Sequence, residues 1–254
     1  MYSPAKCIGC GTCVETCPEN ALTLAADGIV TDTDLCTVCG KCAEVCPTLA
    51  IEMSGKTMSV SAIMDIIEKD RIFFDQSGGG VTFSGGEPLV HSKMLLELLV
   101  ECGKRSIHRA VDTAGNVSTE TLLEVAENTD LFLYDLKMMD TGLHREWIQA
   151  GNERILQNLK VLAATGAHII IRIPLIGGVN DTDENIDQTA RFISELAGDK
   201  KEVHLLPYHN IAQNKYNKLG KSDDFEILKE PAKDTLAKAI VTFETYGIKA
   251  GIGG

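Results

Sequence analysis

Two copies of one cysteine motif, within the first 47 residues, constrain this chain more than any other feature. The first copy reads Cys-x2-Cys-x2-Cys-x3-Cys-Pro from Cys7 to Pro18, and the second repeats it from Cys36 to Pro47. Together the copies hold eight of the nine cysteines. A segment this short cannot bury a large apolar core, so we expect its fold to depend on cross-links through the cysteines.

The spacing of these cysteines predicts two iron–sulfur clusters. Cysteines separated by two residues on a tight loop can bring three thiolates to three corners of a [4Fe–4S] cube, as in two-cluster bacterial ferredoxins. In such pairs the fourth cysteine of each copy ligates the other cluster. We therefore assign Cys7, Cys10, Cys13 and Cys46 to cluster I, and Cys36, Cys39, Cys42 and Cys17 to cluster II.

Disulfides and structural zinc fit the cysteine pattern less well. A structural zinc site joins two ligand pairs across a long gap, which this continuous repeat does not show. Cluster thiolates must stay reduced, so we expect a cytoplasmic protein. The apolar tails at 21–24 and 49–52, one after each Cys-Pro, are expected to pair as small strands. The ninth cysteine, Cys102, lies in an apolar helical stretch and is expected to be inert core.

Composition and length limit the classes of partner. The chain has 254 residues and a net charge of −12, which argues against nucleic acid and anionic membrane surfaces as partners. No apolar run reaches the roughly 18 residues of a membrane helix, and no signal peptide precedes the first motif. We expect a ferredoxin-like domain at 1–57 and a larger domain at 58–254.

Short apolar strands alternate with helices of about 10 to 15 residues after residue 58, which is typical of βα units around a parallel sheet. The remaining stretch, about 195 residues, is shorter than the roughly 250 that a full eight-stranded barrel needs. We expect an α/β fold, an incomplete barrel with its ligand site at the carboxyl ends of the strands. Six strands are predicted, at 81–83, 107–111, 131–134, 169–173, 203–206 and 248–252, with helices at 59–69, 92–105, 119–128, 153–165, 184–196 and 232–246.

Polar and ionisable residues recur at the carboxyl ends of successive strands. Paired glycines let a ligand approach the backbone closely, a glutamate can hold an ammonium group, and a lysine can hold a carboxylate. Together these groups suit the zwitterionic end of an amino acid. The strand ends carry Ser84, Gly85, Gly86 and Glu87, then Asp112 and Thr113, then Asp135, Leu136 and Lys137, then Arg172, and finally His209.

Structural roles are the alternative for each of these residues. The glycine pair can form a plain strand-to-helix turn, and the aspartates can cap loops. The arginine can serve as a structural ion-pair partner, and a single histidine is commonly a hydrogen-bonded structural residue. These alternatives apply to Gly85, Gly86, Asp112, Asp135, Arg172 and His209.

The ordered motifs resemble those of the glycyl-radical-enzyme activating enzymes, a group of radical S-adenosylmethionine (SAM) proteins that includes pyruvate formate-lyase activating enzyme. The resemblance covers residues 59–254 nearly continuously, and many members also carry a two-cluster ferredoxin insert, as residues 1–57 would be here. It rests on the run from Gly78 to Pro88, Asp112-Thr113, Asp135-Leu136-Lys137, Leu206-Pro207-Tyr208-His209 and Lys215-Tyr216.

The resemblance implies a fold and a set of ligand contacts. The fold is a partial (β/α)6 radical-SAM-type barrel. Asp112, Thr113 and Asp135 match a monovalent cation site that lies beside the SAM carboxylate in some members. The SAM contacts implied by the resemblance fall on Gly85, Gly86, Glu87, Asp112, Asp135, Leu136, Lys137, Arg172 and His209.

The resemblance also implies an activity. SAM is cleaved reductively to methionine and a 5′-deoxyadenosyl radical, which takes a hydrogen from a backbone glycine of a partner glycyl radical enzyme. A flavodoxin or ferredoxin is the implied electron donor, and the two clusters of the cysteine module would be auxiliary. The partner's identity is not encoded in any residue of the chain.

One motif of the family is absent from the sequence. Members hold their SAM-cleaving cluster with Cys-x3-Cys-x2-Cys on the first strand of the barrel, before the ferredoxin insert. Cys13 and Cys17 have the spacing of the first two cysteines of this motif, but Asn20 stands at the position of the third. In the second copy, Leu49 stands at the position of the third cysteine after Cys42 and Cys46. We therefore expect a chain that begins late, without that first strand. A third [4Fe–4S] cluster is then expected in the full-length protein, and this chain is expected not to cleave SAM.

The main alternative function is an electron carrier, in which a two-cluster ferredoxin is fused to a barrel that binds a metabolite without cleaving it. This hypothesis assumes that the full-length protein also lacks the Cys-x3-Cys-x2-Cys motif. A docking or regulatory protein for a glycyl radical enzyme is a further alternative, with less support. Counting iron discriminates the first two, because the full-length enzyme would hold about twelve irons and the carrier eight, with four irons per cluster.

Overall fold

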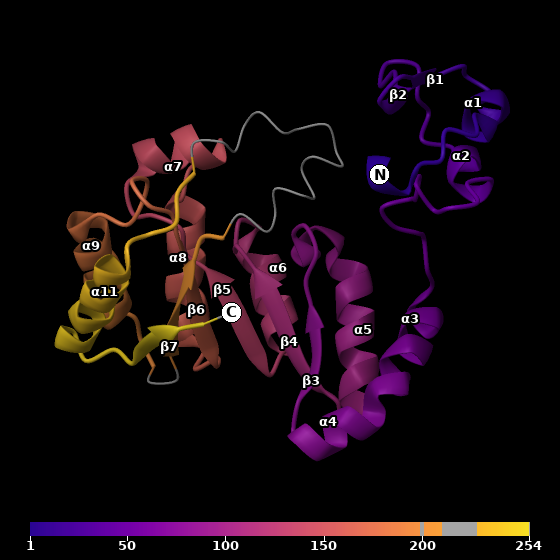
Figure 1. Ribbon diagram of the computed structural model, residues 1–254. Helices are drawn as coiled ribbons and strands as arrows, with labels where there is room; N and C mark the ends of the chain where they lie inside the picture. The colour runs from indigo at the N-terminus through magenta and orange to yellow at the C-terminus, as the bar shows by residue number, and fades with distance from the viewer. Residues whose placement is uncertain (199–200, 210–227, 254) are drawn as a thin grey trace. The chain divides into compact units, whose positions relative to one another are not determined.

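The computed structural model describes residues 1–198, 201–209 and 228–253 (Figure 1). The chain divides into two compact units, of which the first contains Met1–Thr57 and the second Met58–His209 and Leu228–Gly254. The first unit ends where the sequence predicts the end of the cysteine module, although the independence of the two as domains stays a prediction.

The first unit repeats one local structure in its two cysteine copies. Helices α1 (Thr12–Thr16) and α2 (Lys41–Glu44) lie at equivalent places in the repeat. Each begins after a glycine with left-handed backbone, Gly11 at φ 74° and Gly40 at φ 82°, a conformation that side chains other than glycine rarely adopt. A short 3-10 helix, η1 (Pro4–Lys6), precedes the first copy.

The predicted pairing of the two apolar tails is wrong. Strand β1 (Leu22–Ala25) pairs antiparallel with β2 (Gly28–Thr31), which follows it directly. The second tail instead meets the start of the chain, where Ile51 forms a bridge with Tyr2. The reason is local: a turn of two residues after Ala25 reverses the chain at once, so β1 finds a partner before the second copy is reached.

The second unit contains a parallel sheet of six strands in chain order, β3-β4-β5-β6-β7-β8 (Figure 1). The α/β class and the six predicted strands are therefore confirmed. Their bounds are β3 (Gly80–Phe83), β4 (His108–Thr113), β5 (Leu131–Asp135), β6 (Ile169–Leu175), β7 (Lys201–Pro207) and β8 (Ala250–Ile252).

Six helices match the predicted ones: α3 (Val60–Ile67), α5 (Ser92–Lys104), α6 (Thr119–Ala126), α8 (Glu153–Ala164), α9 (Asp183–Ser194) and α11 (Lys233–Thr245). Side-chain caps begin three of them, α3 at Ser59, α6 at Ser118 and α9 at Thr182. The sequence did not predict α4 (Arg71–Ser77), α7 (Thr141–Ile148) or η3 (Pro88–His91), and the predicted helix at 59–69 ends in the 3-10 helix η2 (Glu68–Asp70). None of the described helices is long and apolar enough to cross a membrane.

The two faces of the sheet differ in chemistry. Along β6, buried Ile169, Ile171 and Ile173 alternate with less buried residues, among them Arg172. The buried set belongs to one apolar core with residues of α8, α9 and α11. Successive side chains of a strand point to opposite faces, so Arg172 points away from that core. We call the side opposite the helices the polar face.

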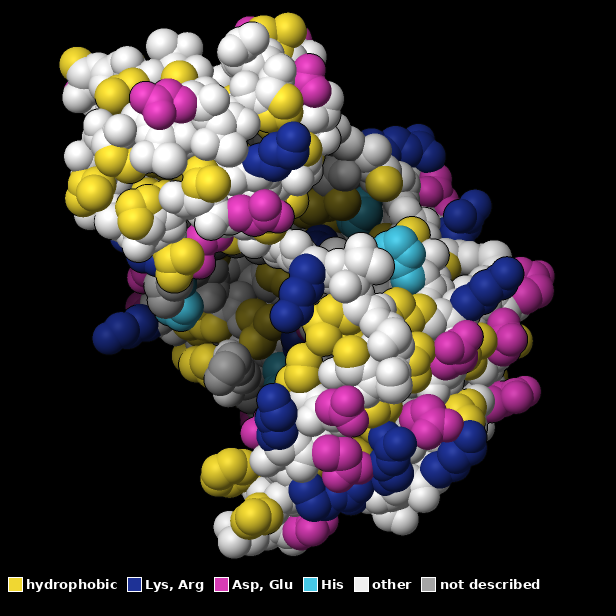
Figure 2. Space-filling model, turned by 90° about the vertical axis from the view of Figure 1, so that its right-hand side faces the viewer, with side chains coloured by type: hydrophobic (Ala, Val, Ile, Leu, Met, Phe, Trp, Pro, Cys, Tyr) yellow, Lys and Arg dark blue, Asp and Glu magenta, His cyan; other side chains and the backbone are white. Residues whose placement is uncertain are grey.

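Ion pairs join the helices at the surface of the second unit. Glu68 pairs with Arg71 and Arg105, and Glu101 pairs with Lys104 and Arg105. Figure 2 shows Lys, Arg, Asp and Glu side chains intermixed over the visible face of this unit. These exposed pairs contribute little stability, because water screens them.

Candidate functional site

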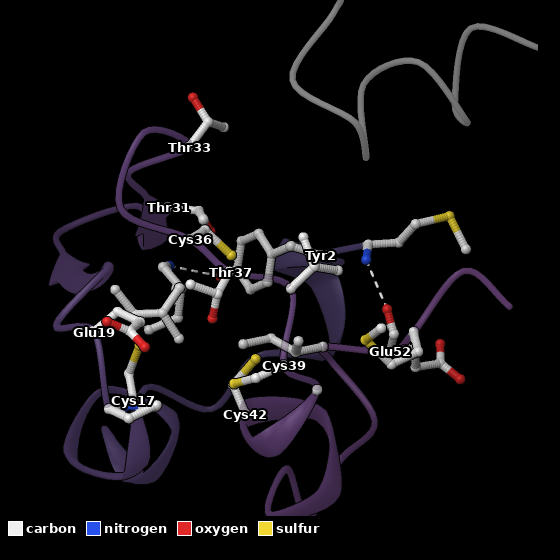
Figure 3. Close-up of a pocket in the computed structure, with 18 residues that line it drawn as sticks. Tyr2, Cys17, Glu19, Thr31, Thr33, Cys36, Thr37, Cys39, Cys42 and Glu52 are labelled. Carbon is white, nitrogen blue, oxygen red and sulfur yellow. Dashed lines mark hydrogen bonds between the residues drawn. The ribbon is translucent and has the colours of Figure 1, made fainter. Parts of the chain in front are cut away.

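The structure gathers the eight motif cysteines into the two predicted sets of four. A hollow of about 640 Å³ is lined by Cys17, Cys36, Cys39 and Cys42, the cluster II set (Figure 3). A tighter hollow of about 20 Å³ is lined by the cluster I set, Cys7, Cys10, Cys13 and Cys46. All nine cysteines lie in the described part of the chain, and none forms a disulfide.

The chemistry of these donor sets fits iron–sulfur clusters. Four thiols around one hollow, with the fourth supplied by the other copy of the repeat, is the arrangement that two-cluster ferredoxins use. In the described residues, no group of three or more His, Cys, Asp or Glu side chains is placed to hold a single metal ion. The sulfur atoms therefore do not converge as they do around one zinc ion.

Hydrogen bonds reach several of the cysteine sulfur atoms. The Ala21 amide donates to Cys17 Sγ at 3.4 Å, and the Ala50 amide donates to Cys46 Sγ at 3.2 Å. The Thr12 hydroxyl donates to Cys10 Sγ at 3.5 Å and lowers the pKa of that thiol. Such donors favour the thiolate, which is the form that ligates iron.

At the carboxyl ends of the strands, Arg172 joins two carboxylates. Its Nε lies 3.0 Å and its Nη2 2.7 Å from Asp135 Oδ1, and the same Nη2 donates to Asp112 Oδ1. Asp135 and Arg172 are paired residues of β5 and β6, and Asp112 lies on β4, the next strand. All three side chains are about 20% exposed. We call Asp112, Asp135 and Arg172 the arginine cluster.

Two further polar groups border the arginine cluster. Lys137 Nζ lies 4.0 Å from Asp135 Oδ2, and the Ser84 hydroxyl donates to Asp112 Oδ2 at 2.9 Å. Two positive and two negative side chains therefore meet at this edge of the sheet. A carboxylate ligand can be held here by exchanging ion-pair partners with Arg172 or Lys137.

The cation site implied by the family resemblance stays a prediction, and the side chains that it would use have protein partners in this structure. It requires Asp112 and Asp135 to face a monovalent cation together with Thr113. In the structure the guanidinium of Arg172 already bridges the two carboxylates. Thr113 is buried and donates its hydroxyl to Glu87 Oε1 at 2.8 Å. In this structure the positive charge between the two carboxylates comes from Arg172.

Glu87 connects two loops of the site. Its Oε1 accepts hydrogen bonds from the Thr113 hydroxyl at 2.8 Å and the Leu89 amide at 3.3 Å, and its Oε2 accepts from the Ala114 amide at 3.0 Å. With these three donors the carboxylate holds the loop after β3 against the loop after β4. The predicted role of Glu87 toward an ammonium group stays a prediction.

The glycine pair before Glu87 leaves its backbone accessible. Gly85 has a φ of 134°, which is open to few residues besides glycine. Gly86 has ordinary backbone, and a Cβ added at either glycine would meet no atom within 4 Å. Both glycines are exposed. A ligand can therefore reach the peptide groups of this turn directly.

Three buried asparagines hold the loops at this edge of the sheet. Asn158 donates to the Gly115 and Val117 carbonyls, after β4. Asn152 donates to the Met138 and Met139 carbonyls, and Asn180 to the Lys137 and Pro174 carbonyls. Each side chain is at most 2% exposed, so its hydrogen bonds are costly to break.

The last two predicted contact residues are Leu136 and His209. The Leu136 side chain is buried in the apolar core, so only its backbone is available to a ligand. His209 follows β7, and its Nδ1 lies 3.4 Å from Glu230 Oε1. Lys215 and Tyr216 of the quoted motifs lie outside the described residues.

Sequence reasoning missed several residues that shape these sites. Ser84 was named only as part of a motif, and the three asparagines carry no pattern that separates them from surface amides. Thr12 and Thr48 had a signal that could have found them, because each follows a cluster cysteine by two residues in the repeat. Cys102 is confirmed as core: it is fully buried, and burial raises the pKa of its thiol.

Two family profiles match the chain. Residues 6–50 match a 4Fe-4S dicluster domain, and residues 36–193 match the radical SAM superfamily. The first match covers both cysteine copies, and the second covers more than half of the chain. The predicted combination of a dicluster ferredoxin-like segment and a radical SAM fold is confirmed.

Proteins similar to this chain include two activating enzymes. The trans-4-hydroxy-L-proline dehydratase activating enzyme of Clostridioides difficile is 40% identical over 257 residues, covering 100% of this chain and 84% of that protein. The choline trimethylamine-lyase activating enzyme of Oleidesulfovibrio alaskensis is 36% identical and covers 87% of this chain and 73% of its own.

A solved structure agrees with these relatives. A domain of a pyruvate-formate lyase-activating enzyme from Bacteroides vulgatus superposes with a TM-score of 0.60 at 39% identity, covering 69% of this chain and 99% of that one. The electron-carrier hypothesis is not favoured by these relatives. The chain belongs to the radical SAM superfamily and, within it, to the glycyl radical enzyme activating enzymes.

Proposed function

We propose that the chain binds SAM at the carboxyl ends of β3 to β6, in the service of glycyl radical formation on a partner enzyme. The observation that carries this proposal is the arginine cluster beside the accessible backbone of Gly85 and Gly86. An α-amino acid group needs a positive partner for its carboxylate and backbone acceptors for its ammonium. This edge of the sheet offers both kinds of group.

The residues have distinct tasks in this proposal. Bound SAM would supply the 5′-deoxyadenosyl radical that removes a hydrogen from the partner's glycine, when one electron from a cluster with a Cys-x3-Cys-x2-Cys motif, which this sequence does not contain, cleaves it to methionine and that radical. Arg172 and Lys137 hold the methionine carboxylate, while Asp112 and Asp135 keep the guanidinium in place. The peptide groups of the glycine turn receive the ammonium group. Glu87 and Asn158 fix the loops on which this geometry depends.

We also propose that the first unit holds two [4Fe–4S] clusters on the assigned cysteine sets. The grouping of the eight sulfur atoms around two hollows supports this proposal. About eight irons per chain is the expected content, since each cluster contains four. A flavodoxin or ferredoxin in the cytoplasm remains the proposed electron donor.

The names of the relatives suggest the class of partner. The enzymes that they activate are a hydroxyproline dehydratase and a choline trimethylamine-lyase. We propose that the partner of this chain is likewise a glycyl radical lyase, which eliminates a small leaving group from its substrate. Electron paramagnetic resonance of candidate partners, after incubation with an active enzyme, would show a glycyl radical on the right one.

Calorimetric titration with SAM under anaerobic conditions tests the binding site. The sequence contains no Cys-x3-Cys-x2-Cys motif, so the experiment measures binding and not cleavage. Gly86→Val adds a side chain where no atom of the protein lies within 4 Å. It should therefore leave the fold intact and obstruct the ligand. Lys137→Met removes a positive partner of the carboxylate.

Each variant should raise the dissociation constant for SAM about tenfold or more, which corresponds to about 1.4 kcal/mol. Lys104→Met is the matched control, because this exposed lysine pairs only with Glu101 among the described ion pairs. It should bind SAM like the parent protein. Unchanged affinity in both site variants, or no binding by the parent, would overturn the proposed site.

A further inference from the structure

The two cysteine copies differ at two positions that lie beside ligand sulfur atoms. Two residues after Cys10 the first copy has Thr12, where the second copy has Lys41 after Cys39. Two residues after Cys46 the second copy has Thr48, where the first has Glu19 after Cys17. Because the fourth cysteines are exchanged, both threonines accompany ligands of cluster I.

Both threonine hydroxyls are within hydrogen-bond distance of these sulfur atoms. Thr12 Oγ1 lies 3.5 Å from Cys10 Sγ, and Thr48 Oγ1 lies 3.8 Å from Cys46 Sγ. A ligating thiolate has no proton, so each hydroxyl must be the donor once iron is bound. One amide donor occurs at the same place in both copies, Ala21 to Cys17 and Ala50 to Cys46. Among the described hydrogen bonds, a side-chain hydroxyl reaches a ligand sulfur only in the cluster I set, and Lys41 and Glu19 stand at the equivalent positions of the other copy.

Acidic side chains border only one of the two hollows. Glu19 and Glu52 line the cluster II hollow, where Figure 3 shows both of them. Glu52 has a partial partner in Lys6, 3.4 Å away at an exposed position. The residues that line the cluster I hollow include no Asp or Glu. Negative charge near a cluster opposes the addition of an electron.

We propose that Thr12 and Thr48 make cluster I the more easily reduced of the two clusters, so that the first electron to enter the module resides there. This inference rests on the two-cluster assignment made above. Reduction adds one electron to a [4Fe–4S]²⁺ cluster and increases the negative charge on its sulfur ligands. Hydroxyl donors stabilise that form, and hydrogen bonds to the sulfurs are an established control of cluster potential.

A redox titration followed by electron paramagnetic resonance tests this proposal on the full chain. Dithionite supplies the electrons, and the parent protein should show two separate midpoint potentials. The double variant Thr12→Val and Thr48→Val keeps the side-chain volume and removes both donors. It should lower the higher midpoint, about tenfold in the reduction equilibrium or 59 mV for one electron, and leave the lower midpoint in place.

Two more variants sharpen the assignment. Glu19→Thr places a hydroxyl in the first copy where the second copy has Thr48, and removes an acid from the cluster II hollow. It should raise the lower midpoint and narrow the separation. Thr33→Val is the matched control, because Thr33 lines the cluster II hollow without a described hydrogen bond to sulfur. It should change neither midpoint.

The outcomes separate this inference from the cluster assignment. Iron analysis of the parent protein is done first, and about eight irons per chain establishes both clusters. With eight irons present, unchanged midpoints in the double threonine variant overturn the role of the threonines, as does a shift confined to the lower midpoint. A parent protein with about four irons or fewer overturns the two-cluster assignment, and this inference falls with it.

Discussion

The two units of the chain are stabilised in different ways. In the first unit the buried apolar cluster consists of Cys13, Leu22 and Ile29, and one of these three is itself a proposed iron ligand. In the second unit one apolar core extends across the sheet from β4 to β7 and into the helices that cover it. A unit with so little buried surface needs another source of stability, which metal ligation can supply. The second unit needs none.

Removal of iron should show the difference in stability between the two units most clearly. Without clusters, the first unit loses the links between its two copies, and its small buried apolar cluster cannot offset the conformational entropy of about 57 residues. Amide hydrogen exchange followed by mass spectrometry should show complete exchange of residues 1–57 in iron-free protein. The peptides of β4, β5 and β6 should stay protected.

The control for iron removal is the same protein reconstituted with iron and sulfide, in which protection of residues 1–57 should return. Protection of the cysteine module in iron-free protein would show that its small core is sufficient. Loss of protection in β5 as well would show that the second unit also depends on the clusters. Either result would contradict the proposed division of stability.

A cavity in the apolar core of the second unit should destabilise that unit and leave the first unit unchanged. Phe243, on α11, is fully buried in that core. Phe243→Ala removes its ring and leaves a cavity, at a cost of about 3 to 5 kcal/mol in the free energy of unfolding. Denaturant unfolding should show this loss for the second unit, while the iron content of the first unit stays at the parent value.

Val241→Ala is the control for the core variant, since Val241 lies on the same helix and is 57% exposed. It should change the unfolding free energy by about 0.5 kcal/mol or less. An equal effect of the two substitutions would mean that α11 is not packed as the structure shows. Iron loss in Phe243→Ala would mean that the stability of the units is coupled.

Arg172→Met tests the charge balance of the site. Its expected effect, on the binding of SAM, is smaller in free energy than that of the core substitution. It leaves Asp112 and Asp135 without the guanidinium that bridges them. SAM affinity should fall about tenfold, or about 1.4 kcal/mol, because the ligand carboxylate then meets two acids with Lys137 as their remaining positive partner in the site. Potassium or sodium ions should restore part of the affinity in this variant and have little effect on the parent.

Arg191→Met provides the comparison for the site variant, since Arg191 is an exposed arginine of α9 that pairs with Glu195. It should bind SAM normally at any salt composition. If the parent protein itself requires a monovalent cation for SAM binding, then Arg172 does not supply the positive charge at this place. That result would restore the cation site implied by the family resemblance.

The sequence predicted the larger unit well because its signals are local. Alternation of apolar strands and amphipathic helices located six strands and six helices, and the order of the motifs identified the family. The helix Thr141–Ile148 was missed because it lacks a clear apolar stripe: of its residues only His144 is buried. The sequence named both Asp135 and Arg172 as site candidates. It did not predict that they lie side by side, because that depends on the register between β5 and β6.

The errors and omissions were non-local. The pairing of Ile51 with Tyr2 joins residues far apart in the chain, and a pattern of apolar tails does not reveal it. The three hydrogen bonds of Glu87 depend on the loop after the neighbouring strand. The sequence therefore did not reveal that Glu87 connects two loops, and its role toward an ammonium group stays a prediction. Sequence patterns locate elements, while side-chain partners depend on how those elements assemble.

The smallest predicted effect concerns an ion pair of the second unit. Asp130 accepts hydrogen bonds from the Arg109 amide, Nε and Nη2, each at 2.8 Å, and the side-chain hydrogen bonds of Arg109 lower the pKa of Asp130. The Asp130 side chain is 35% exposed, so solvent screening limits the energy. Asp130→Asn should cost about 1 kcal/mol at pH 7.

The pH dependence of this cost follows from the direction of the pKa shift. Because the folded-state pKa of Asp130 lies below its unfolded value of about 3.9, the stabilisation is fully present above pH 5 or so. It is lost as pH falls through the folded pKa. Urea midpoints of parent and Asp130→Asn proteins should therefore differ at pH 7 and converge below about pH 4. A constant difference would mean that lost packing, and not the charge, carries the effect. A small loss of unfolding free energy that disappears at low pH would show that charge contributes little to the stability of a unit that burial already stabilises.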